Sequence, residues 1–212
     1  MFLLIYRYLK LSRELPQTPW TIRNVKMAKT SIQELIIYFR IPEGDAERRL
    51  KLLSAGREDV DVRCLGNGRP FAVEFNDPTF TPTEEQLNEN DIALLKVGEE
   101  TKHKVYEALC IKLAHSEYDT VMLLQQITPI RVLHRRSLHT RPRKILDVQA
   151  RLVPGHPQLF IVRLRTEAGT YIKEWVHGDL GRTKPSLVDA VKAQVDILAL
   201  DVCAVELEWP KS

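Results

Sequence analysis

Residues 159–165 read LFIVRLR, and residues 169–183 read GTYIKEWVHGDLGRT. The side chains of the first string alternate as those of a β-strand do. Gly169 follows this strand and allows the chain to turn tightly, because glycine adopts backbone conformations that other residues avoid. The spacing in the second string places Ile172, Val176 and Leu180 on one helical face, with Lys173 projecting elsewhere. We therefore predict a strand, a turn and a helix in this order.

Other segments predict further strands and helices around this joint. A capping box of Ser31 and Glu34 predicts a helix that starts at Ser31, and its apolar stripe consists of Ile32, Leu35, Ile36 and Phe39. Strands are expected at residues 71–75 (FAVEF) and at Val205, Leu207 and Trp209, and an acidic helix at residues 83–95. The predicted fold class is α+β, with a mixed, largely antiparallel sheet core and flanking helices.

No internal repeat, low-complexity tract or Gly/Ser linker divides the chain. We therefore expect one mixed unit over residues 31–212. Residues 1–30 are basic and irregular, and Pro16 and Pro19 bracket an extended pair of residues. This segment is predicted to be an extension that packs along the domain.

Composition excludes several classes of protein. The chain has 212 residues, of which 44% are hydrophobic and 28% charged, as in ordinary globular proteins, and its net charge of +3 is too small to indicate nucleic-acid binding by itself. The apolar start is interrupted at Arg7, which makes it too short for a membrane span or a secretory signal. Cys64, Cys110 and Cys203 form no C-x-x-C pair, so we expect no metal and an intracellular location, in cytoplasm or nucleus. Oligomeric state is left open.

A stretch without acidic residues runs from residue 120 to residue 146. Its basic residues are Arg131, Arg135, Arg136, Arg141, Arg143 and Lys144, with His134 and His139 between them. Arginine suits phosphate because its planar fork pairs with two oxygens and also stacks on bases. A solvated basic face is the usual alternative. Residues 77–100, however, carry seven acidic residues against a single lysine, and this asymmetry favours the steering of a polyanion to one surface.

A second charged segment, residues 56–70, reads GREDVDVRCLGNGRP. Its glycines and proline predict a turn that displays charge. Asp59 and Asp61 would face the same way on an extended backbone and repel each other unless cations such as Arg57 and Arg63 neutralise them. A salt-bridged loop and a catalytic site are equally good interpretations of these residues.

Three strings resemble signatures of the pseudouridine synthase superfamily in their order along the chain. Gly56 to Asp59 (GRED) resembles the G-R-x-D motif around the catalytic aspartate, Lys104 to Tyr106 (KVY) the motif that supplies the active-site tyrosine, and Gly169 to Lys173 the G-T-Y-I-[RK] motif. More narrowly, LPQTPW (15–20), residues 56–71, TPIRVLHRR (128–136) and residues 169–183 resemble the archaeal and eukaryotic tRNA synthases that modify T-loop uridines at positions 54 and 55. The resemblance spans essentially the whole chain and implies a catalytic domain over residues 31–212.

The resemblance implies a role for each matching residue. Asp59 would be the essential carboxylate, which either adds to the uracil ring or attacks or deprotonates the ribose. Tyr106 would stack on the extruded base, Lys173 would pair with Asp59 in a shared cleft and keep it ionised, and Arg57 would help to displace the target nucleotide. Leu200 would close the pocket, although ordinary core packing is the better interpretation there. The isomerisation needs no cofactor, and tRNA is the implied substrate.

Two points qualify the resemblance. Members of this family usually carry an additional N-terminal RNA-binding portion with C-x-x-C zinc ligands, and this chain starts where that portion should end, so we expect a fragment, an incomplete gene model or a reduced variant. The main alternative is an RNA-binding or RNA-chaperone module, in which the basic stretch at 131–144 holds RNA and Asp59 is structural. A hydrolase that uses Asp59 and Asp61 as paired acids is much less favoured.

Overall fold

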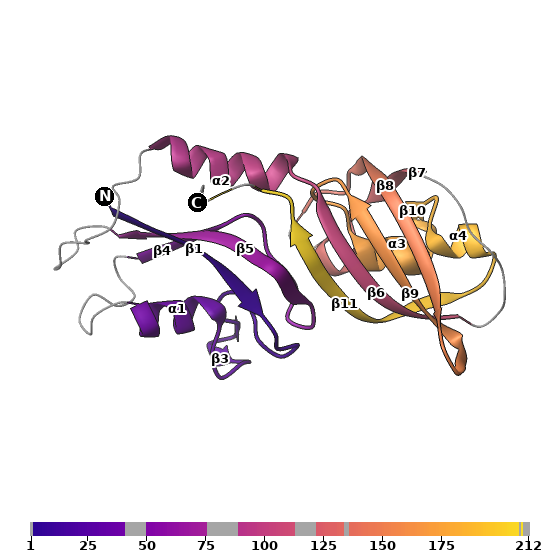
Figure 1. Ribbon diagram of the computed structural model, residues 1–212, viewed down its shortest axis with the longest axis horizontal. Helices are drawn as coiled ribbons and strands as arrows, with labels where there is room; N and C mark the ends of the chain where they lie inside the picture. The colour runs from indigo at the N-terminus through magenta and orange to yellow at the C-terminus, as the bar shows by residue number, and fades with distance from the viewer. Residues whose placement is uncertain are drawn as a thin grey trace. The chain divides into compact units, whose positions relative to one another are not determined.

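The computed structural model describes residues 2–40, 50–75, 89–112, 122–133, 136–207 and 209. The chain divides into two compact units (Figure 1). The first comprises residues 1–102 and 204–212, and the second comprises residues 103–203. Both are built on antiparallel strands with a few helices, so the predicted α+β class holds in each. Among the described residues, no helix has the length and apolar character that crossing a membrane requires.

The first unit has a three-stranded antiparallel sheet with β5 (Arg63–Phe75) at its centre. β1 (Phe2–Lys10) pairs with one edge of β5 and β4 (Leu50–Ser54) with the other. Helices α1 (Ile32–Arg40) and α2 (Glu89–Thr101) lie on opposite faces of this sheet (Figure 1). The core is formed by Tyr8, Ile32, Phe71 and Val73. A small exposed hairpin, β2 (Thr21–Ile22) and β3 (Val25–Lys26), precedes α1.

The second unit has a larger sheet, in the order β11, β6, β9, β8, β7, β10. The bounds of these strands are β6 Lys104–Lys112, β7 Met122–Ile127, β8 Thr140–Val153, β9 His156–Thr166, β10 Thr183–Lys184 and β11 Val195–Val205. Two short helices, α3 (Ile172–His177) and α4 (Leu187–Val191), and two 3₁₀ turns, η1 (Ile130–Val132) and η2 (Gly178–Gly181), complete it. Helices α3 and α4 lie on one face of this sheet (Figure 1) and bury Trp175, Val176, Leu187 and Val191.

Several predicted elements are confirmed. The helix after Ser31 forms, and the Ser31 hydroxyl accepts a hydrogen bond from the Glu34 amide at 3.2 Å, as an N-cap should. Residues 71–75 lie in β5 and residues 159–165 in β9. The predicted acidic helix is present as α2 from Glu89 onwards, and its expected start at residue 83 lies outside the described residues.

Three predictions about local structure are wrong. Residues 2–10 are not irregular: they form β1, because Tyr8 and Lys10 point into the unit while Leu9 stays exposed. The strand expected at 205–209 ends at Val205, and Leu207 and Trp209 are buried without belonging to a strand. Leu180 does not continue the buried face of α3, since Gly178 ends that helix with a φ of 76° and leaves Leu180 88% exposed. The predicted boundary at residue 30 stays a prediction.

Candidate active site

The G-R-E-D string forms the connection between β4 and β5 in the first unit. A turn closes it, in which the Val62 amide donates to the Asp59 carbonyl at 3.1 Å. Arg57, Asp59 and Asp61 are exposed, as the sequence predicted for a turn that displays charge, but Glu58 is buried. Asp59 and Asp61 therefore lie on a turn and not on an extended strand, and β5 begins immediately afterwards at Arg63.

Buried charges hold Glu58 in place. Its carboxylate accepts from Arg69 Nε at 2.7 Å, and the side chains of both residues are only 1% exposed. The Tyr8 hydroxyl donates to the same carboxylate at 2.9 Å, and burial together with this negative charge raises the pKa of Tyr8. Arg69 Nη1 also donates to the Ala55 carbonyl at 2.6 Å. Contacts to its side chain thus hold Glu58, the residue before Asp59. The hydrogen bond to the Ala55 carbonyl holds the backbone at the start of the loop.

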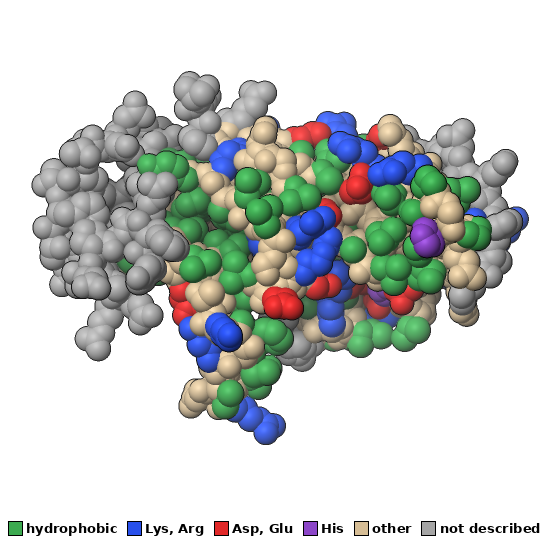
Figure 2. All heavy atoms as spheres, turned by 60° about the horizontal axis from the view of Figure 1, so that its bottom comes forward, with side chains coloured by type: hydrophobic (Ala, Val, Ile, Leu, Met, Phe, Trp, Pro, Cys, Tyr) green, Lys and Arg blue, Asp and Glu red, His purple; other side chains and the backbone are tan. Residues whose placement is uncertain are grey.

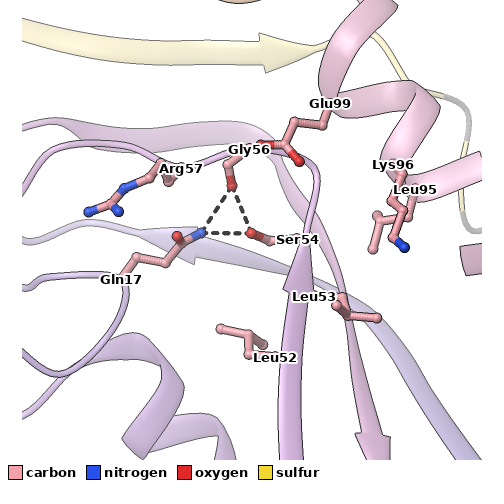
Figure 3. A pocket seen from close by; sticks show the side chains of 9 residues that line it. All are labelled: Gln17, Leu52, Leu53, Ser54, Gly56, Arg57, Leu95, Lys96 and Glu99. Atoms are coloured by element: carbon pink, nitrogen blue, oxygen red, sulfur yellow. Dashed lines mark hydrogen bonds between the residues drawn. The ribbon is translucent and has the colours of Figure 1, made fainter. Parts of the chain in front are cut away.

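Gln17 links the LPQTPW string to the same loop. Its amide nitrogen lies 2.8 Å from the Tyr8 hydroxyl, 3.0 Å from Ser54 Oγ and 3.1 Å from the Gly56 carbonyl. Gln17, Ser54 and Gly56 line a pocket of about 260 Å³, together with Arg57 and with Leu95 of α2 (Figure 3). Gln17 therefore uses its donors within the protein. Through Ser54 and Gly56 it supports the loop that carries Asp59.

Lys10 supports the loop from its other side. Its ammonium, at the end of β1, donates to the backbone carbonyls of Asp59 at 2.7 Å, Val60 at 2.8 Å and Val62 at 2.7 Å. Arg13 adds a hydrogen bond to the Asp61 carbonyl at 2.9 Å. We did not predict roles for Lys10, Gln17 or Glu58 from the sequence. The alternation of Tyr6, Tyr8 and Lys10 could have indicated that Lys10 faces the core.

The other two motifs lie in the second unit. Tyr106 is on β6, opposite Leu164 of β9, and is half-buried. Lys173 is on α3 and is also half-buried, between the buried residues Ile172 and Glu174. Leu200, on β11, is 7% exposed. Asp59 belongs to the first unit, so the prediction that Asp59, Tyr106 and Lys173 share one cleft stays a prediction.

Two contacts shape the G-T-Y-I-K turn. Gln126 of β7, which is buried, pairs with the backbone of Tyr171: its amide nitrogen donates to the Tyr171 carbonyl at 2.8 Å and its amide oxygen accepts from the Tyr171 N–H at 2.9 Å. Gly169 has a φ of 73°, and the guanidinium of Arg143 lies 3.3 Å from where a Cβ would be. The positive φ therefore favours glycine at this position, whereas the Arg143 side chain would need to shift only slightly to make room for a Cβ.

Arg131, Arg136 and Arg143 of the basic stretch lie beside this turn or the helix that follows it, whereas Arg141 contacts Thr128. Arg136 donates to the Tyr171 hydroxyl at 2.9 Å, Arg141 to the Thr128 hydroxyl at 2.6 Å, and Arg131 forms an ion pair at 2.7 Å with Glu174. Burial raises the pKa of Glu174, and Arg131 opposes that shift. Lys144 is exposed on β8, while Arg135 lies outside the described residues.

Charge on the visible surface is mixed. On the face in Figure 2, Lys and Arg side chains are interspersed with Asp and Glu. Of the acidic segment expected at residues 77–100, residues 77–88 lie outside the described ranges. In the part of the chain that the structure describes, no group of three His, Cys, Asp or Glu side chains could hold a metal ion.

The fold resembles that of a known structure. The match is to a chain in the crystal structure of a Cbf5–Nop10–Gar1 complex, with a TM-score of 0.53 and 16% sequence identity, and it covers 93% of this chain and 47% of that one. This likeness is one of fold, and the predicted α+β class is confirmed.

Sequence comparison identifies the family. Residues 3–90 and 83–206 match the family model described as Pus10, C-terminal, so the chain belongs to this family. The tRNA pseudouridine synthases Pus10 of Mus musculus and Homo sapiens are each 41% identical to it, over 96% of this chain and 44% of their own length. That of Thermofilum pendens is 33% identical, over 94% of this chain and 51% of its own. The chain thus spans about half the length of the curated relatives it matches.

Proposed function

We propose that this chain is an isomerase that converts uridine to pseudouridine in the T loop of tRNA, at position 55, with position 54 as a further candidate. Its relatives are named tRNA pseudouridine synthases. The observation that carries the proposal is the state of the G-R-E-D loop: Asp59 is exposed, while the residues around it are held by buried charged and polar side chains. A carboxylate presented on a fixed backbone is what attack on an RNA substrate requires.

The reaction breaks the bond between N1 of the base and C1′ of the ribose, turns the detached base, and joins its C5 to C1′. The proton displaced from C5 balances the one that N1 gains, so no redox partner or cofactor is consumed. Asp59 acts as the nucleophile or as the base. In either role it must be ionised, and it must reach a nucleotide that has left the base stack.

The remaining residues assist this step. Tyr106 provides an aromatic face for the extruded base, and Lys173 provides the cation that favours an ionised Asp59. Arg57, which is exposed and is one of the residues that line the pocket in Figure 3, helps to displace the target nucleotide. Leu200 closes the pocket that receives the extruded base. The phosphate contacts come from Arg63 and the basic stretch. Arg131 must first exchange its ion pair with Glu174 for a phosphate.

The experiment is to incubate a T-loop transcript with this chain alone and to map pseudouridine by mass spectrometry. We expect product with the wild-type chain and none with Asp59→Asn, while RNA binding by that variant is largely kept. Asp61→Asn is the matched control, because Asp61 is also exposed on the same turn. No product at high wild-type concentration would refute the proposal, and loss of turnover in Asp61→Asn instead of Asp59→Asn would refute the assignment to Asp59.

A non-catalytic RNA-binding module is the second candidate, favoured by Arg136 and Arg143 beside the Tyr171 turn. It predicts that Asp59→Asn leaves every function intact. Both candidates predict that replacing Arg135 and Arg136 weakens RNA binding and flattens its dependence on salt, by about one unit of slope for each lost phosphate contact. An unchanged slope would assign these arginines to an ordinary solvated surface.

A further inference from the structure

Lys10 is a buried lysine whose side chain reaches the Asp59 turn. The acceptors of its three hydrogen bonds there are all backbone carbonyl oxygens. The residue is 1% exposed. Its three hydrogen bonds, to the carbonyls of Asp59, Val60 and Val62, lie between 2.7 and 2.8 Å. An ammonium has three donors, so this geometry uses every one of them on a single turn.

The three carbonyls need a cation. Their oxygens converge on one point, where their partial negative charges repel each other unless a positive group lies between them. Burial lowers the pKa of Lys10, which means that keeping an ammonium here costs free energy. An apolar side chain would avoid this cost, but the Asp59 carbonyl would keep only the Val62 amide as a recorded donor, and the Val60 and Val62 carbonyls would lose the ammonium. Glutamine offers two donors and methionine none, while the planar fork of arginine spreads its donors apart.

Lys10 holds one end of the two-residue segment Glu58–Asp59, and the other end is held as well. Glu58 is held by Arg69 and Tyr8 through its side chain, and the next residue, Asp59, is held by Lys10 through its carbonyl. With the backbone fixed on both sides of its Cα, Asp59 has only its side-chain torsions left. The direction in which its carboxylate leaves the turn is therefore set by Lys10 and Glu58 together.

We propose that Lys10 is a positioning residue for Asp59, which holds the backbone of residues 59–62 so that the Asp59 carboxylate meets its target atom. Lys10 can act in this way only if the proposed function holds. It touches neither substrate nor reacting atoms, so its removal should lower the rate of the chemical step and leave RNA affinity in place.

Single-turnover and steady-state kinetics on a T-loop transcript test this. For Lys10→Met we expect a fall in kcat of about 100-fold with KM changed by less than about threefold, because a misplacement near 1 Å costs that much. Lys51→Met is the control, since Lys51 is exposed on β4, and it should keep the wild-type kcat. In Lys10→Ala, added propylammonium replaces the missing atoms and should restore part of the rate, whereas propanol should not.

Hydrogen exchange supplies a readout that does not depend on turnover. The Val62 amide, which donates to the Asp59 carbonyl, should exchange faster in Lys10→Met, while the β1–β5 ladder keeps its protection. A wild-type kcat in a folded Lys10→Met, an unchanged Val62 exchange rate, or no rescue by propylammonium would each overturn the role of Lys10. Global unfolding of both Lys10 variants would also overturn it, in favour of a general structural role. A wild-type chain without product would instead refute the proposed function.

Discussion

Removing Arg69 should destabilise the first unit by more than any surface substitution could. In Arg69→Met the Glu58 carboxylate keeps only the Tyr8 hydroxyl as a recorded hydrogen-bond donor, and the Ala55 carbonyl loses its bond to Nη1. Breaking a buried ion pair from one side costs about 3–5 kcal/mol, because an uncompensated charge stays in the interior. A domain is stable by about 5–15 kcal/mol in total, so this loss is a large fraction of what is available.

A double-mutant cycle separates the pair from its surroundings. Glu58→Gln removes the negative charge and keeps the shape, so the double variant no longer holds a lone carboxylate. We expect a coupling free energy of about 2 kcal/mol, with the double variant more stable than the sum of the single changes. Arg57→Met is the control: this arginine is exposed on the same loop, and its loss should change stability by less than about 0.5 kcal/mol.

Urea unfolding followed by tryptophan fluorescence measures these differences. A Trp175→Phe background removes the buried indole of the second unit, so that Trp209, 4% exposed, reports on the first. A cost below about 1 kcal/mol for Arg69→Met would show that the pair contributes little. Strict additivity in the cycle would show that Glu58 and Arg69 do not depend on each other. Either result would refute the reasoning.

Three further outcomes are expected. Gly68→Ala should lower the melting temperature more than Gly155→Ala, because both have a positive φ but only the Gly68 methyl would meet backbone, at 2.5 Å from the Tyr8 carbonyl oxygen. Ser186→Ala should cost about 1 kcal/mol in urea at pH 7 through loss of the α4 cap. The cost of Ser186→Ala should shrink as acid protonates Asp189. The hydrogen bond from the Ser186 amide lowers the pKa of Asp189, so the stability that this carboxylate contributes is fully present above the ordinary carboxyl pKa and is lost as the pH falls through the lowered pKa. Burial raises the pKa of Cys64 to about 11 and that of Cys110 to about 12, so at pH 8 a thiol reagent should react with both far more slowly in the native chain than in urea.

The elements that follow from local patterns were predictable. α1 was found because Ser31 and Glu34 stand three residues apart before an apolar stripe, and β9 because its side chains alternate. The errors have a physical cause in long-range contacts. Val205, Leu207 and Trp209 are buried at every second position, as in a strand, yet the carbonyls of Leu207 and Trp209 accept from the guanidinium of Arg7, some 200 residues away. Local sequence cannot show which donor a carbonyl will find.

The same limit applies to the candidate site. Motifs predicted catalytic roles for Asp59, Tyr106 and Lys173 because those positions lie in short strings of fixed spacing. Several groups that hold the Asp59 loop, those of Tyr8, Lys10 and Arg13, come from about 50 positions earlier in the chain. In the sequence, Lys10 is simply one of three lysines in the basic segment 1–30. Only its burial and its three carbonyl partners set it apart. Because a buried ammonium must satisfy all its donors, the turn can keep its shape only while β1 delivers Lys10 to it, so the stability of β1 and the geometry of Asp59 are coupled.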